Sequence, residues 1–137
     1  MNAPAAETGR QRRSGPHLVL LTVYAIFILA AGGRSLVQIF TDFSRAPVAY
    51  VLSLVAALTY VAGWFAIRRA AAGKPAFAKV MLCVELAGVL IVGTLSLVRT
   101  DWFPDATVWS HYGSGYGWVP AVLPVAGLVW LWKGLHR

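Results

Sequence analysis

One carboxylate lies inside a long apolar run of the sequence. Glu85 falls within the segment 78–98, and the other apolar runs contain no acidic residue. A carboxylate surrounded by apolar residues is costly to bury, so it needs a hydrogen-bonding partner or a proton. Groups of this kind also bind protons or cations in transport paths. Glu85 is therefore the first place to look for chemistry.

Hydroxyl groups from the two preceding apolar runs fall at the depth of Glu85. That residue lies about seven positions into its run, or ~10 Å along a helix. The same depth contains Tyr24 in the first run and Thr59 and Tyr60 in the second. We expect these four residues to form an intramembrane polar site. The site is either a hydrogen-bonded tether between helices or a proton-binding site of a small carrier. No second acidic or histidine side chain joins Glu85, which favours the tether.

A second set of reactive side chains lies in the connection 99–118. Two carboxylates and an imidazole could bind a metal or act in acid–base catalysis, but their spacing fits no metal-ligand pattern. The alternative is a belt of aromatic residues at the membrane surface, in which Asp105 caps a short helix over 106–110. We therefore expect no metal, cofactor or catalytic residue here, and treat the connection as a candidate interaction site. Its members are Asp101, Asp105, Trp109, His111, Tyr112 and Tyr116.

The glycine-rich run 113–117 belongs to the same connection. It matches neither a dinucleotide-binding motif, nor a phosphate-binding loop, nor the nucleophile motif of hydrolases. Glycines at this place would instead let the backbone pack closely where the chain re-enters the membrane.

The composition requires a membrane around these residues. Of 137 residues, 58% are hydrophobic and 12% are charged, whereas about a quarter of a soluble domain is charged. At ~20 residues for each crossing, the length allows about four transmembrane helices and no separate soluble domain. The predicted fold is an all-α transmembrane four-helix bundle over residues 18–137, with spans at about 18–33, 48–67, 78–98 and 117–133.

The basic residues predict the orientation of this bundle. Nine of the twelve lie in the tail, the central link and the C-terminal end, and three lie in the other two connections. The positive-inside rule then places both termini in the cytoplasm. The net charge of +7 is explained by this topology and by attraction to anionic lipid at the cytoplasmic face. Nucleic-acid binding is not needed to explain it.

The start of the chain allows two interpretations. Residues 1–17 are polar and basic without periodicity, and are expected to be a disordered cytoplasmic tail. The following run ends in Ala-Ala-Gly-Gly and resembles a secretory signal. Cleavage there would leave three spans and break the alternation of charge, so we expect this helix to be retained. Cys83 is the single cysteine, which excludes an internal disulfide.

Several stretches resemble a family of small four-span actinobacterial integral membrane proteins to which no activity is assigned. These are LAAGGRSLVQIF, RAPVAYVLSLVAAL, ELAGVLIVGTLSL and the run from FPDATVW to VWLW, of which W-S-x-Y-G-x-G-Y-G-x-V-P is the most distinctive part. The resemblance implies fold and membrane location and brings no catalytic residues.

The expected role is a non-catalytic accessory or scaffold subunit in the plasma membrane. It would bind a larger membrane complex or a second copy of itself. The alternative is a small proton-coupled carrier that uses Glu85.

Overall fold

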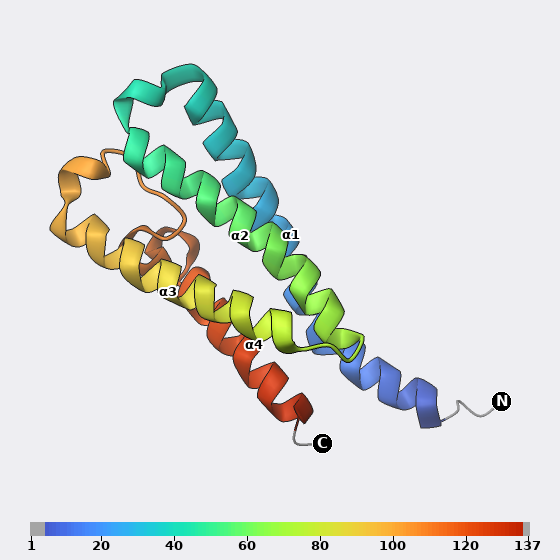
Figure 1. Cartoon of the computed structure of the whole chain (residues 1–137). Coiled ribbons are helices and arrows are strands. Elements are labelled where there is room, and N and C mark those ends of the chain that lie inside the picture. Colours follow the sequence, from blue (N-terminus) through green and yellow to red (C-terminus); the bar gives the residue numbers. More distant parts are fainter. Residues whose placement is uncertain (1–4, 136–137) are drawn as a thin grey trace.

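The computed structural model describes the backbone of residues 5–135 and the side chains of residues 15–133. This part of the chain is helical, without a β-strand (Figure 1). The long helices are α1 (Ala5–Asp42), α2 (Pro47–Ala71), α3 (Ala76–Val98) and α4 (Val119–Leu135). Short 3-10 segments lie in the connections: η1 (Phe43–Arg45), η2 (Thr100–Trp102) and η3 (Ser110–Tyr116).

Three of the long helices are long and apolar enough to cross a membrane. The candidate spans are 15–45, which is α1 from Gly15 together with η1, 47–71 (α2) and 76–98 (α3). A fourth crossing exists only if η3 and α4 form one broken span, because they meet at an angle of 95°. The expected fourth span at about 117–133 is thus a helix from Val119 that is preceded by a sharp bend.

Helix α1 is longer than the first predicted span. It begins at Ala5, whereas residues 1–17 were expected to lack regular structure; residues 1–4 lie outside the described part of the chain. At its other end it continues through Arg34 to Asp42, as the near-helical spacing of apolar residues before Pro47 indicates. Pro47 then begins α2, where its fixed φ suits the first turn of a helix.

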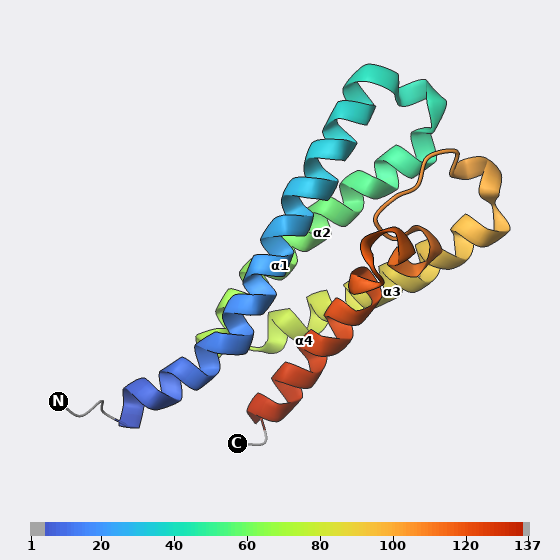
Figure 2. The ribbon, with the colours of Figure 1, turned by 180° about the vertical axis from the view of Figure 1, so that it is seen from behind.

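The helices pack in chain order. Helix α1 lies against α2, α2 against α3, and α3 against α4. The start of α1, the α2–α3 link and the end of α4 share one end of the molecule, and the α1–α2 connection lies at the opposite end (Figures 1 and 2). We call the first of these the basic end. Its lysines and arginines with described side chains are Arg68, Arg69, Lys74, Lys79 and Lys133.

The surfaces of the helices differ sharply between the inside and the outside. Small side chains such as Ala56 and Ala57 are buried on α2, and Ala31 is buried on α1. Large apolar side chains such as Leu29 and Leu58 are exposed on the outer faces, at 76% and 60% of their surface. An apolar exterior of this kind is stable in lipid and would associate in water.

The connection between α3 and α4 turns back toward the middle of α3 (Figure 2). The ring of Trp109 lies so close to Gly88 that a Cβ atom on that glycine would be 2.7 Å from the ring. Tyr112 packs in the same way on Gly93. The connection therefore fills the outer half of the space between the helices, where the short α4 does not reach.

Candidate functional site

The carboxylate of Glu85 is buried at the centre of the molecule. The residue is 1% exposed. The hydroxyl of Tyr24 on α1 donates to both carboxylate oxygens, at 2.8 Å to Oε1 and 2.7 Å to Oε2. The bond joins the first and third long helices, so the expected contact between these two residues is present.

Gly63 provides the space for this contact. A Cβ atom at this position would lie 2.6 Å from Cε1 of Tyr24 and 2.8 Å from Oε2 of Glu85. Any larger residue on α2 would separate the tyrosine from the carboxylate. The place of Gly63 beside the carboxylate was not predicted from the sequence.

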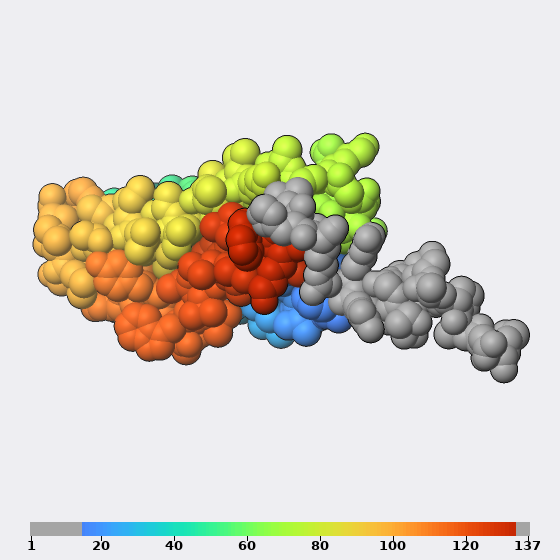
Figure 3. Space-filling model, turned by 90° about the horizontal axis from the view of Figure 1, so that it is seen from below, coloured from blue at the N-terminus to red at the C-terminus, as the bar shows by residue number. Residues whose placement is uncertain are grey.

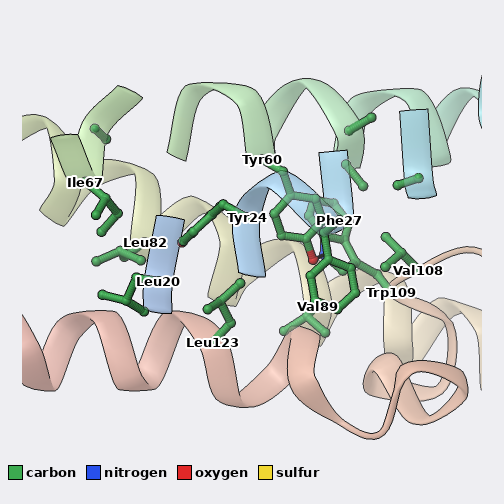
Figure 4. Close-up of a cluster of buried hydrophobic side chains, with 14 of the residues drawn as sticks. Leu20, Tyr24, Phe27, Tyr60, Ile67, Leu82, Val89, Val108, Trp109 and Leu123 are labelled. Carbon is green, nitrogen blue, oxygen red and sulfur yellow. Dashed lines mark hydrogen bonds between the residues drawn. The ribbon is translucent and has the colours of Figure 1, made fainter. Parts of the chain in front are cut away.

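Tyr60 lies at the expected depth with a different partner. Its ring meets the ring of Tyr24 edge to face, with centroids 5.9 Å apart. Its hydroxyl accepts a hydrogen bond of 2.9 Å from Nε1 of Trp109. Phe27 stacks on the same tyrosine at 5.5 Å. Figure 4 shows how these aromatic side chains converge from α1, α2 and the α3–α4 connection.

Thr59 does not take part in the polar site. Its hydroxyl donates to the backbone carbonyl of Val55, one turn earlier in α2, at 2.8 Å. A threonine in a helix readily makes this local bond, which satisfies its polar atom without a partner from another helix. The structure thus brings together Glu85, Tyr24 and Gly63, with Tyr60 beside them.

The two carboxylates of the outer connection have separate basic partners. Asp105 accepts bonds from Nε of Arg45 at 3.0 Å and from the hydroxyl of Tyr50. Asp101 accepts bonds from Arg99, two residues earlier. The bond from Tyr50 and the charge of Arg45 lower the pKa of Asp105, and Arg99 lowers the pKa of Asp101.

These pairs change the interpretation of the outer connection. Between residues 15 and 133, no group of three or more His, Cys, Asp or Glu side chains could hold a metal ion. The expected helix over 106–110 with Asp105 as its cap is not formed: residues 108 and 109 form a turn and η3 begins at Ser110. The oxygens of Asp105 bind Tyr50 of α2 and Arg45 of η1 instead. In the turn that precedes η3, Oγ1 of Thr107 accepts hydrogen bonds from the backbone N–H groups of Trp109 and Ser110 at 3.1 Å.

The aromatic members of the predicted outer site point inward. Trp109 is 3% exposed, the hydroxyl of Tyr112 lies 2.9 Å from that of Thr94, and the ring of Tyr116 lies 5.7 Å from that of Phe27. Trp109 belongs to the core, whereas Tyr112 and Tyr116 are half-buried. The six predicted residues therefore do not form one site.

The backbone of this segment adopts an uncommon conformation. His111 and Tyr112 have φ values of 51° and 61°, followed by Gly113 at 84°. Non-glycine residues avoid this left-handed region unless the surroundings hold them there. Part of that support is a bond of 2.9 Å from the N–H of His111 to Oγ of Ser96. The close approach expected for the glycine run occurs at Gly113, where a Cβ atom would lie 2.8 Å from Pro120.

The basic end has a different character. Arg68 lies over the ring of Trp64 at 4.9 Å, and Arg69 lies over Phe77 at 6.0 Å. Among the residues of this end whose side chains are described (within 15–133), none is acidic, whereas the two ion pairs in the described part of the chain both lie at the opposite end.

Comparison of the chain with models of protein families, with curated proteins and with solved structures finds no match.

Proposed function

We propose that this chain is a non-catalytic accessory or scaffold subunit of a membrane complex, folded as a transmembrane four-helix bundle. The contact of Tyr24 with Glu85 is the observation that supports this role most strongly. A transport site must be reached by its substrate, but this carboxylate is 1% exposed and both of its oxygens are hydrogen-bonded to a neighbouring helix. In the proposed role Glu85 is a structural tether.

The distribution of charge supports insertion in the plasma membrane with both termini on the cytoplasmic side. The cations of the basic end have no acidic partner among the residues whose side chains are described, 15–133, which fits the cytoplasmic side and its anionic lipids. At the other end Arg45 and Arg99 are neutralised by Asp105 and Asp101.

A flux assay tests the scaffold role against the carrier alternative. The wild-type protein and Glu85→Gln are placed in vesicles with a pH gradient, beside protein-free vesicles. The proposal expects all three preparations to lose the gradient at the same rate. Faster loss with the wild-type protein than with Glu85→Gln would support a proton-coupled carrier and contradict the tether.

The partner is tested by affinity capture from native membranes in mild detergent, followed by mass spectrometry. We expect one membrane protein in near-stoichiometric yield, retained by Glu85→Gln because the tether faces away from the surface. Capture of the chain without a stoichiometric partner would contradict an accessory role.

A further inference from the structure

The two oxygens of Glu85 share one hydrogen-bond donor. Oη of Tyr24 lies 2.8 Å from Oε1 and 2.7 Å from Oε2, and both distances are typical of an O–H···O hydrogen bond. A tyrosine hydroxyl has a single hydrogen, and a hydrogen bond weakens steeply when it departs from linearity. One of the two contacts therefore lacks a well-directed hydrogen from Tyr24, and a hydrogen on the carboxyl group itself would supply it.

No cation or further side-chain donor compensates an ionised Glu85 in the described part of the chain. The two ion pairs among residues 15–133 do not include this residue. The neighbouring indole N–H, that of Trp109, donates to Tyr60 instead. Lys79 is the nearest cation along α3, but it lies six residues or ~9 Å of helical rise away and is exposed. An ionised carboxylate would thus have one donor for two oxygens.

Two titratable side chains face Glu85 from the helices packed around it. They are Tyr24 from α1 and Tyr60 from α2, whose rings meet edge to face. Gly63 of α2 packs beside the carboxyl group without a side chain. Helix α4 has no titratable residue within 119–132. The charge of an ionised Glu85 would therefore face aromatic rings and apolar side chains.

The α3–α4 connection closes the same region without bringing a charge to it. Its tyrosines contact Gly93 and Phe27, and His111 is exposed. Figure 3 shows the surface of the connection (orange) meeting the surfaces of α3 (yellow) and α4 (red) directly on this face. Glu85 is 1% exposed, so bulk solvent does not stabilise a charge on it. Burying an isolated ionised carboxylate is far more costly than burying the neutral acid.

We propose that Glu85 is a neutral carboxylic acid in the folded protein and that it forms two reciprocal hydrogen bonds with Tyr24. The phenol O–H donates to one carboxyl oxygen, and the acid O–H on the other oxygen donates back to the phenol oxygen. Both short contacts then contain a hydrogen, both hydrogens have an acceptor, and no charge is buried. The inference rests on the proposed role of Glu85 as a tether and does not depend on the identity of a partner.

Infrared spectroscopy of isotope-labelled protein tests the protonation state. The sequence contains two glutamates, Glu7 and Glu85, so Glu7→Gln leaves Glu85 as the single glutamate. This variant is made by cell-free synthesis with glutamate that carries ¹³C in its side-chain carboxyl group, and is placed in lipid vesicles at pH 7. A protonated carboxyl group has a C=O stretching band that a carboxylate lacks, and the label lowers its frequency. The variant that also contains Glu85→Gln has no glutamate and provides the baseline.

We expect a label-sensitive C=O band at pH 7 that is absent from the baseline. This measurement leaves Tyr24 and Glu85 unchanged, so it does not depend on whether a variant of the pair folds. A label-sensitive carboxylate band in its place would overturn the proposal. Adding Tyr24→Phe should keep the C=O band and raise its frequency, because the carboxyl group loses its hydrogen-bonding partner. A band that Tyr24→Phe leaves in place would overturn the reciprocal bonds.

The flux assay described above separates this inference from the scaffold role. A carboxylate band at pH 7 without protein-dependent loss of the pH gradient would overturn the neutral acid alone. A C=O band together with faster loss of the gradient in wild-type protein than in Glu85→Gln would contradict the tether, and the neutral acid would then belong to a carrier.

Discussion

The hydroxyl of Tyr24 donates to both carboxylate oxygens of Glu85, at 2.8 and 2.7 Å, across the space between α1 and α3. Gly63 of α2 lies beside this contact and leaves room for it. The two residues and Gly63 form the structural centre of the molecule.

Gly63→Ala should destabilise the protein. Its Cβ atom would lie 2.6 Å from the Tyr24 ring, and overpacking of this kind costs about 1–3 kcal/mol. The matched control is Gly33→Ala on α1, where no atom lies within 4 Å of an added Cβ; this change should be neutral or stabilising by up to about 1 kcal/mol. Unfolding free energies measured in detergent check both. Equal effects of the two substitutions would contradict the packing described at Gly63.

Trp109 and Tyr60 should be energetically coupled. Tyr60→Phe leaves the buried indole N–H without its acceptor, at a cost of about 1–3 kcal/mol. Trp109→Phe removes the donor as well as part of the ring. In a double-mutant cycle the combined variant should lose less stability than the sum of the single losses. Additive losses would show that the hydrogen bond does not contribute.

The contact of Tyr24 with Glu85 could be expected from the similar depth of the two residues along their predicted spans. Tyr24 lies six positions after the start of the predicted span 18–33 and Glu85 seven positions after the start of the predicted span 78–98, and a buried carboxylate needs a donor. Tyr60 lies at the same depth, but its hydroxyl accepts a hydrogen bond from Trp109, which comes from a segment distant in sequence. The inclusion of Thr59 was wrong because its local bond to Val55 competes with any partner on another helix.

The path of the α3–α4 connection could not be predicted from composition. Aromatic residues at a membrane surface and aromatic residues packed inside a protein have the same types and similar spacing. A usable signal was present on α3, where Gly88 and Gly93 each accept an aromatic ring. Matching these glycines to Trp109 and Tyr112 would have required knowledge that the connection turns back toward the middle of α3.

Asp105 should make stability depend on pH in the acid range. Its pKa is lowered in the folded protein by Tyr50 and Arg45, so its contribution is complete above its ordinary pKa of 3.8 and is lost as the pH falls through the lower, folded value. Asp105→Asn should therefore reduce stability at pH 7, and its difference from the wild-type protein should shrink below about pH 4. Thermal unfolding as a function of pH measures this. A difference that stays constant down to pH 2 would contradict the assignment.

The two ends of the molecule should be accessible from opposite sides of the membrane. In a background lacking Cys83, Ser44→Cys places a thiol in η1, and Ala72→Cys places one at the basic end; both native residues are exposed. A membrane-impermeant maleimide should label Ser44→Cys in intact cells and should label Ala72→Cys only after permeabilisation. The reverse labelling pattern would contradict the proposed orientation.

The most direct test of the tether is a double-mutant cycle between Tyr24 and Glu85, measured as unfolding free energy in mixed micelles. Tyr24→Phe leaves the carboxylate without its donor, Glu85→Leu leaves the hydroxyl without its acceptor, and the double variant removes both unpaired groups. We predict that the double variant loses less stability than the sum of the single losses, by about 1–3 kcal/mol. Additive losses, with each single change below about 0.5 kcal/mol, would contradict a structural role for Glu85.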